Sequence, residues 1–253
     1  MGSGFEDQLL SEYDSTTLTH HILESESSKV SSRVFFLSPN LIAKQFLPGE
    51  KIDMLDALQL ATLLGVRAPS IKRTIETAEN VYVVMERIYG QTLDEAWIHL
   101  GWFTTLRLAF QLRQFIHRMR AQTSTTAGSL SNGICTSVWI DDYYGLPSHA
   151  SPESITVFIN FWLNFVPPSR HKQGNHHYKE LLSQHHVPLV FTHQDLAPRN
   201  MIVDERCQLW LLDWDYSGWY PVYFEYASMQ NFDVPSNWRW IDRFRWKLFS
   251  WIT

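Results

Sequence analysis

The stretch FTHQDLAPRNMIVDERCQLWLLDWDYSG, residues 191–218, sets a histidine, several aspartates and an asparagine among strand-forming apolar residues. Polar groups beside buried strands are costly unless they have partners or a chemical task. The centre of the stretch predicts a β-hairpin, with strands at 201–203 and 208–212. Because a hairpin brings its chain back to where it began, we expect Asn200, just before the first strand, to lie close to Asp213, just after the second.

The residues at the open end of this hairpin predict a metal site. The carboxylate of Asp213 and the amide oxygen of Asn200 suit a hard cation such as Mg²⁺, which also holds phosphate oxygens. Asp195 lies on the preceding loop and could accept a proton from a hydroxyl. Each of the three residues alone is also typical of a turn beside a hairpin. The full set at this spacing favours a catalytic site.

Composition narrows the class of protein. The 253 residues carry a net charge of −5, which argues against a nucleic-acid partner held by bulk charge. Cys135 and Cys207 give neither a disulfide framework nor zinc spacing. The polar N-terminus does not read as a signal peptide, and the apolar stretch 155–166 is too short to span a membrane. We therefore expect a cytoplasmic protein with no membrane span; the sequence gives no indication of its oligomeric state.

The pattern before Gly90 predicts strands and one helix. Residues 34–47 predict two strands joined by a Ser-Pro-Asn turn, 54–66 a helix, and 70–76 and 80–88 two more strands. Residues 1–30 are polar, and we expect them to be partly disordered or a helical lead-in.

The pattern after Gly90 predicts helices at 92–100, 104–121, 154–166, 175–186 and from 237 onward, with a long loop at 121–153. Two apolar stripes are expected to pack on the core: Leu106, Phe110, Leu112, Phe115, Ile116 and Met119 in one helix, and Trp240, Phe244, Leu248 and Trp251 in the tail. The layout predicts an α+β fold with a small β-rich lobe, residues 1–88, and a larger, mainly helical lobe, residues 89–253.

The motif His193-Gln194-Asp195 followed by Asn200 resembles the catalytic loop of the protein-kinase-like fold, with Asp213 at the position of its second metal-binding aspartate. The longer pattern FTHQDLAPRN…LLDWDYSGWYP resembles the aminoglycoside phosphotransferase and choline kinase branch. The trailing GWYPVYFEYASM is similar to the version common in fungal phosphotransferase-like enzymes. This branch usually has a glutamate where the chain has Asp215.

The resemblance implies a nucleotide site between two lobes. It implies that Lys44 contacts the phosphates and pairs with a helix carboxylate, which is Asp56 or, as alternatives, Asp53 or Glu50. The backbone from Glu86 to Ile88 would hydrogen-bond adenine, and Met85 would line the pocket.

The resemblance also implies roles in the catalytic loop. Asp195 would orient and deprotonate a hydroxyl, while Asn200 and Asp213 would hold Mg²⁺. His193 would organise the loop, and Arg199 would either touch phosphate or pair with a carboxylate. Two further acids, Asp215 and Glu225, are expected to be structural anchors.

The implied function is Mg²⁺-dependent transfer of the γ-phosphoryl group of ATP, or GTP, to a hydroxyl of a small metabolite or antibiotic-like acceptor. Residues 121–152 and 155–166 are expected to line the acceptor site, where Phe158, Phe161 and Trp162 favour a partly aromatic acceptor. One departure is that residues 26–36 offer serines and no glycine-rich loop. The alternatives are a catalytically silent pseudokinase acting as a binding module, and a kinase-like fold used for non-kinase chemistry on a metabolite.

Overall fold

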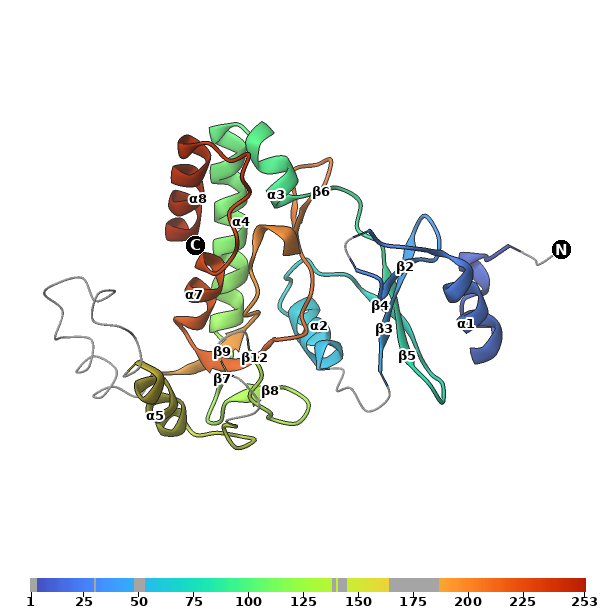
Figure 1. Cartoon of the computed structure of the whole chain (residues 1–253), viewed down its shortest axis with the longest axis horizontal. Helices are drawn as coiled ribbons and strands as arrows, with labels where there is room; N and C mark the ends of the chain where they lie inside the picture. The colour runs from blue at the N-terminus through green and yellow to red at the C-terminus, as the bar shows by residue number, and fades with distance from the viewer. Residues whose placement is uncertain (1–3, 30, 48–52, 138–139, 141–144, 164–186) are drawn as a thin grey trace, which may run out of the picture.

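The computed structural model describes residues 4–29, 31–47, 53–137, 140, 145–163 and 187–253. In these residues the chain forms a small lobe built on a five-stranded sheet and a larger lobe that contains most of the helices (Figure 1). The predicted α+β, two-lobed fold is confirmed. The helix predicted at 175–186 lies outside the described residues. The division between residues 88 and 89 stays a prediction.

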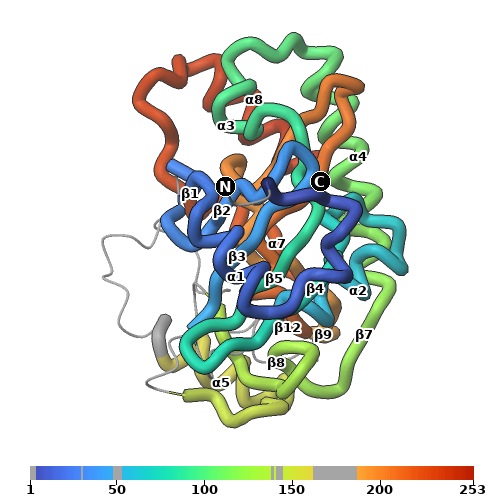
Figure 2. The backbone as a smooth tube through the Cα atoms, turned by 90° about the vertical axis from the view of Figure 1, so that its right-hand side faces the viewer, coloured from blue at the N-terminus to red at the C-terminus, as the bar shows by residue number. Residues whose placement is uncertain are grey.

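The sheet of the small lobe is antiparallel, with strand order β1-β2-β3-β5-β4. Its strands are β1 (Glu26–Ser27), β2 (Val34–Phe36), β3 (Leu41–Phe46), β4 (Ile71–Glu76) and β5 (Val81–Glu86). Helix α1 (Ser15–Glu24) covers one face, as Figure 2 shows, and α2 (Met54–Leu63) packs in the core on the other. The two strand pairs predicted from the sequence therefore form one sheet.

Side chains of β3 alternate between the two faces, as a strand requires. Leu41 and Ala43 pack on the α1 side, whereas Ile42 and Phe46 join the core shared with α2 and the large lobe. Lys44 lies between Ile42 and Phe46 in this alternation, so it points toward the large lobe.

The N-terminal segment is ordered as a helical lead-in rather than disordered. A 3₁₀ turn, η1 (Asp7–Leu9), precedes α1. The side chain of Asp14 caps α1 by accepting the Thr17 N–H at 2.7 Å. Leu18 and Ile22, one turn apart on α1, are fully buried against the sheet. Of the two alternatives expected for this segment, the described residues therefore form the helical lead-in.

The large lobe is organised around α4 (Trp102–Arg120) and α8 (Trp240–Ile252), which pack together. Its other helices within the described residues are α3 (Leu93–Ala96), η2 (Trp97–His99), α5 (Pro152–Leu163), η5 (Pro198–Asn200) and α7 (Phe224–Gln230). One sheet contains β6 (Gln91–Thr92), β10 (Met201–Val203) and β11 (Leu209–Leu211). A second contains β7 (Thr123–Ser124), β8 (Gly128–Ser129), β9 (Leu189–Thr192) and β12 (Gly218–Pro221). The segment predicted as a loop therefore contributes two short strands, β7 and β8.

The two predicted apolar stripes need correction. On α4, Phe110 is exposed, and Leu108 lies on the buried face instead. On α8 the correction is larger, because Trp240, Phe244 and Trp251 all face solvent. The buried face of α8 consists of Asp242, Arg245, Trp246, Phe249 and Ser250. Three of these five residues, Asp242, Arg245 and Ser250, are polar, so the spacing of apolar residues alone did not indicate this face.

The connection between the lobes passes close to the hairpin that carries the predicted site. After β5 the chain enters β6, which pairs with β10, with Gln91 opposite Val203. Gly90 has φ +154°, and a Cβ there would lie 2.3 Å from the carbonyl oxygen of Val203. Glycine is therefore required at this point.

Among the described residues, no helix is long and apolar enough to cross a bilayer.

Replacing Trp97 by alanine is expected to lower the free energy of unfolding by about 3–5 kcal/mol. Its ring is fully buried, stacks on Trp238 at 5.5 Å between centroids, and its Nε1–H donates to the Asp242 carbonyl at 2.9 Å. Trp240→Ala is the matched control, because that ring is 77% exposed, and its effect is expected to stay within about 0.5 kcal/mol. Urea unfolding of both variants measures the difference. Equal losses would contradict the assignment of buried and exposed faces.

Candidate active site

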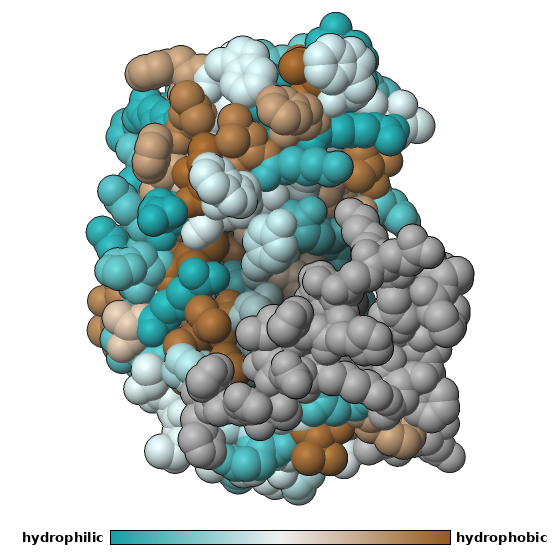
Figure 3. All heavy atoms as spheres, turned by 90° about the vertical axis from the view of Figure 1, so that its left-hand side faces the viewer, coloured by the Kyte–Doolittle hydropathy of each residue, from teal (hydrophilic) through white to brown (hydrophobic). Residues whose placement is uncertain are grey.

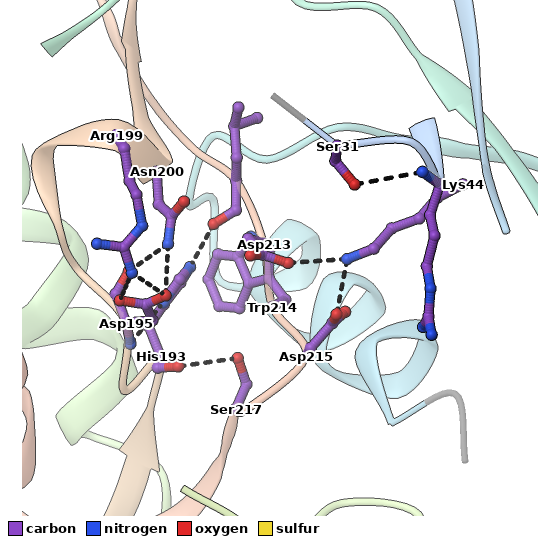
Figure 4. A network of polar contacts seen from close by, with 12 residues as sticks. Ser31, Lys44, His193, Asp195, Arg199, Asn200, Asp213, Trp214, Asp215 and Ser217 are labelled. Atoms are coloured by element: carbon purple, nitrogen blue, oxygen red, sulfur yellow. Dashed lines mark hydrogen bonds and ion pairs between the residues drawn. The ribbon is translucent and has the colours of Figure 1, made fainter. Parts of the chain in front are cut away.

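The hairpin β10–β11 forms as predicted and closes on its flanking residues. Met201 pairs with Leu211 and Val203 with Leu209. Beyond the last pair, the Leu212 N–H donates to the Asn200 carbonyl at 2.8 Å. Asn200 and Asp213 are thereby brought together at the open end of the hairpin, as Figure 4 shows.

The His193 imidazole organises the backbone around this end. It is completely buried, and its Nε2 lies 2.9 Å from the Leu212 carbonyl while the Asp195 N–H donates to its Nδ1 at 3.2 Å. Since Nδ1 accepts, the proton is on Nε2. Burial lowers the pKa of His193 despite the nearby carboxylates of Asp195 and Asp213. The ring is therefore neutral and connects the catalytic loop to the chain just before Asp213.

The Asp195 carboxylate is held by two side chains of its own loop (Figure 4). Asn200 Nδ2 donates to Asp195 Oδ2 at 2.7 Å. Arg199 Nη2 lies 2.9 Å from both Asp195 Oδ1 and Oδ2. Of the two alternatives for Arg199, the structure has the pairing with a carboxylate. The arrangement fixes the orientation of Asp195 without using all its acceptor positions.

Lys44 reaches across from the small lobe to two carboxylates of the large lobe. Its Nζ lies 2.8 Å from Asp213 Oδ1 and 2.7 Å from Asp215 Oδ2 (Figure 4). Asp215, expected only as an anchor, is thus a direct partner of Lys44. Asp213 and Asp215 are two residues apart, and the left-handed backbone of Asp213, with φ +61°, shows that the chain is not an extended strand here.

In the structure Lys44 does not pair with Asp56, the predicted partner. Asp56 is exposed and makes no hydrogen bond or ion pair with Lys44. The alternative Asp53 accepts a hydrogen bond from Asn132 Nδ2 at 2.9 Å instead. Glu50 lies outside the described residues. Lys44 has taken the nearer pair of acids beyond β11, which local sequence pattern could not reveal.

The charges of this cluster shift the pKa values of its members. Burial disfavours the charge on Lys44, but Asp213 and Asp215 outweigh it and raise the pKa of Lys44. Burial likewise opposes the charge on Asp213, but Lys44 outweighs it and lowers the pKa of Asp213. For Asp215, burial together with the adjacent Asp213 charge raises the pKa in spite of Lys44. One cation therefore balances two competing carboxylates.

The donor set at this cluster fits Mg²⁺. One carboxylate oxygen of Asp215, Oδ1, is buried and has no hydrogen-bond partner among the described residues. Asn200 uses its Nδ2 on Asp195, which leaves its amide oxygen for a cation. No three His, Cys, Asp or Glu side chains of the described chain converge as a protein-only metal site. Mg²⁺ needs only one or two carboxylates when phosphates and water complete its shell.

The segment predicted to bind adenine follows β5. Met85 is buried in the core shared by the two lobes. The Glu86 carboxylate accepts a hydrogen bond from Ser70 Oγ at 2.8 Å, which turns its side chain away from solvent. In the described part of the chain, the Ile88 N–H has no backbone acceptor. A backbone donor without a partner is what an adenine ring requires.

The segment without glycines forms a hairpin in the place of a phosphate-covering loop. β1 and β2 pair with Ser27 opposite Phe35. The Arg33 N–H donates to Ser31 Oγ at 3.4 Å. In Figure 4, Ser31 lies on the same side of Asp213 as Lys44.

Glu225 is the anchor of the catalytic loop, as expected from the sequence. Its carboxylate accepts the backbone N–H of His193 at 2.8 Å and of Gln194 at 3.3 Å. Burial raises the pKa of Glu225 to about 7, and the two N–H donors offset only part of this effect.

Two residues here adopt left-handed backbone conformations, Gln194 with φ +66° and Asp213 with φ +61°. Such conformations gather at functional sites, where the surrounding contacts must hold them.

The predicted acceptor wall is described only in part. In α5, Ile155 is buried and Phe158 packs with it in a core cluster, whereas Phe161 is exposed. The side chain of Trp162 and residues 164–166 lie outside the described set. Phe158 therefore packs against the core of the large lobe, and its contact with an aromatic acceptor stays a prediction.

Comparison with family models identifies the chain. Residues 25–245 match the model of the phosphotransferase enzyme family, APH. The match covers most of the chain, which belongs to this family and is a small-molecule phosphotransferase. The predicted family and class of enzyme are confirmed. A comparison with curated protein sequences found no significant match.

Solved structures share the fold at low sequence identity. Aminoglycoside phosphotransferase APH(3'')-Id from Streptomyces rimosus, in complex with ADP and streptomycin, has a TM-score of 0.53 at 13% identity, over 95% of this chain and 92% of that one. Choline kinase LicA from Streptococcus pneumoniae has a TM-score of 0.51 at 15% identity, over 96% and 78%. The gentamicin complex of APH(2'')-IIa has a TM-score of 0.51 at 13% identity, over 99% and 83%. These likenesses show the fold.

Glu225 makes the stability of the protein depend on pH. Its folded pKa of about 7 exceeds the ordinary value, so the folded state binds a proton that the unfolded state releases, and stability falls as pH rises through this window. Between about pH 5 and pH 8 the loss from this group is roughly 2–3 kcal/mol. Glu225→Gln removes the ionisation, so its unfolding free energy should fall by that much less over the same range. Identical pH slopes for both proteins, measured by urea unfolding, would refute the shift.

Proposed function

We propose that the protein transfers the γ-phosphoryl group of ATP or GTP to a hydroxyl of a small molecule in a Mg²⁺-dependent reaction. The observation that carries the proposal is the convergence of Lys44 from one lobe with Asp213 and Asp215 from the other, beside the Asp195–Asn200 pair. A cation held between two lobes and facing paired oxygens is the arrangement that phosphoryl transfer uses. Membership of the phosphotransferase family supports the same reaction class.

Lys44 would exchange its carboxylate partners for phosphate oxygens when nucleotide binds. Asn200, Asp213 and Asp215 supply oxygen donors for Mg²⁺, which when bound would neutralise phosphate charge and orient the nucleotide. Lys44 then becomes available to a second set of negative oxygens, since its raised pKa keeps it charged. The free Ile88 N–H would receive the adenine or guanine base. Most of the catalytic effect would come from positioning and electrostatic stabilisation.

Asp195 would orient the acceptor hydroxyl and take its proton. Its Oδ2 is held by Asn200, and its Oδ1 contacts only Arg199, so Oδ1 has room for a hydroxyl. The Arg199 guanidinium is half exposed and retains donors that can face a transferring phosphoryl group. His193 is a positioning residue in this scheme, because it is neutral, buried and saturated by backbone contacts.

Nucleotide binding can be tested without knowing the acceptor. Mg²⁺-ATP or Mg²⁺-GTP at about ten times its dissociation constant is expected to stabilise the protein by roughly 1.4 kcal/mol, or about 3–5 °C in Tm. Asp213→Asn should abolish the Mg²⁺-dependent part of this rise. Asp56→Asn is the matched control and should keep it, because Asp56 does not contact Lys44. No rise with either nucleotide at millimolar concentration would favour the pseudokinase alternative.

Asp195→Asn is expected to separate binding from chemistry. The variant should keep the nucleotide-induced rise in Tm, since Asp195 is not among the groups proposed to hold phosphate or metal. Its kcat for ADP release with any accepted hydroxyl compound should fall by about 10²–10⁴-fold. Steady-state kinetics over a panel of amino alcohols, aminoglycosides and aromatic alcohols would measure this. An unchanged kcat would remove Asp195 from the reaction and favour non-kinase chemistry.

A further inference from the structure

The solvent face of α8 carries large aromatic side chains along its whole length. Trp240, Phe244 and Trp251 are 77%, 54% and 76% exposed, and half-buried Leu248 borders them. We call these four residues the aromatic stripe. Single exposed apolar residues are normal, whereas a continuous row on one helix marks an interaction surface.

Polar contacts on the opposite face fix the rotation of α8. The Trp97 Nε1–H donates to the Asp242 carbonyl at 2.9 Å. The Arg245 guanidinium donates to the carbonyls of Trp97 and Leu100 and lies over the Trp97 ring, 4.9 Å from its centroid. Rotating α8 to bury the aromatic stripe would break these bonds and leave buried polar groups unpaired. The stripe therefore faces solvent because the fold holds it there.

Basic side chains accompany the aromatic stripe. Exposed Arg243 and Lys247 lie on α8, whose one acid, Asp242, is buried 3.5 Å from Arg245. The neighbouring α4 has four arginines and no acidic residue. The chain as a whole has a net charge of −5, whereas the exposed charged residues of α8, Arg243 and Lys247, are both basic. Figure 3, which faces the side that lies on the left in Figure 1, shows strongly hydrophilic side chains interleaved with apolar ones.

A groove of about 360 Å³ opens where the aromatic stripe ends. Its walls include Arg113, Arg120, Ser250, Trp251 and Thr253. Arg113 uses Nη1 on a carbonyl in the last turn of α8, at 2.6 Å, and keeps further donors. The Nε of Arg120 is buried and has no hydrogen-bond partner among the described residues. Two guanidinium groups beside the Trp251 ring suit a phosphate-bearing headgroup.

We propose that the aromatic stripe, with Arg243, Lys247 and the groove at its end, docks the protein onto membranes that contain anionic lipids. Tryptophan and phenylalanine favour the boundary between headgroups and acyl chains, and the basic side chains are attracted to anionic headgroups. With 13 residues, α8 is about 20 Å long and can lie flat with the stripe toward the bilayer. This is peripheral binding, which needs no membrane-spanning helix.

Charge and position argue for this occupant. A second copy of the chain docked face to face would set the same basic side chains against each other, which is unfavourable. In Figure 1, α8 lies on the side of the large lobe away from the small lobe. Docking there would leave the Lys44–Asp213 cluster uncovered, and the inference does not depend on the proposed reaction.

The test is flotation of the full chain with vesicles of phosphatidylcholine, with or without about 30% phosphatidylserine. The aromatic variant combines Trp240→Ser, Phe244→Ser and Trp251→Ser, and the basic variant combines Arg243→Glu and Lys247→Glu. Leu63→Ser and Lys72→Glu are the matched controls, since both residues are exposed but lie on α2 and β4. Thermal unfolding establishes that each variant folds.

The chain and both controls are expected to float with anionic vesicles, and both variants to bind at least tenfold more weakly. Raising the salt concentration should release the chain, because surface charge is screened. The proposal is overturned if the chain does not bind anionic vesicles, or if the variants bind as the controls do. It is also overturned if the aromatic variant abolishes a dimer, seen by analytical ultracentrifugation, while no vesicle binding occurs.

Discussion

The candidate active site depends on the backbone of Leu212. Its N–H donates to the Asn200 carbonyl and its carbonyl lies against Nε2 of His193, so both polar groups of this residue are bonded to the catalytic loop. Since Asp213 is the next residue, the same contacts set the position of its carboxylate relative to the loop. His193 and most residues of the hairpin strands are buried. Breaking either hydrogen bond would therefore leave a buried polar group with neither a protein partner nor water. The backbone of Leu212 thus fixes the relative positions of His193 and Asp213, which are 20 residues apart in the sequence.

The candidate active site also depends on a positive charge from the small lobe, the ammonium group of Lys44. The alternation of β3 supplies it, because Ile42 and Phe46 must face the shared core and Lys44 lies between them. Two carboxylates meet this single ammonium, and their opposed pKa shifts show that they compete for it. Nucleotide-bound metal would relieve that competition by adding positive charge. The position of Lys44 therefore follows from burial on one strand, and its ion pairs join the two lobes.

The sequence pattern predicted the structure correctly where the contacts join residues that are close in the chain. The hairpin at 201–212 follows from strand residues around a turn, and closure then brings Asn200 to Asp213. It was insufficient where a contact is remote: Lys44 pairs with Asp215, 171 residues away, and nothing near Lys44 favours Asp215 over Asp56. It failed on α8 because Trp and Phe occur on both faces, and buried Asp242 and Arg245 lowered the apolar count of the face that packs. The strands β7 and β8, of two residues each, are too short to show a period.

The tight passage of Gly90 against Val203 has a mechanical consequence. The connection between the lobes is clamped to the hairpin from Gly90 onward, so little chain remains to flex between the end of β5 and that clamp. A swing of the small lobe must pivot there, next to the hairpin that carries Asn200 and Asp213. Because Lys44 lies on β3 of the small lobe, a rotation of that lobe about this point would move the Lys44 side chain relative to Asp213. A change in the angle between the two lobes would therefore change the distance between Lys44 Nζ and Asp213 Oδ1, which is 2.8 Å in this structure.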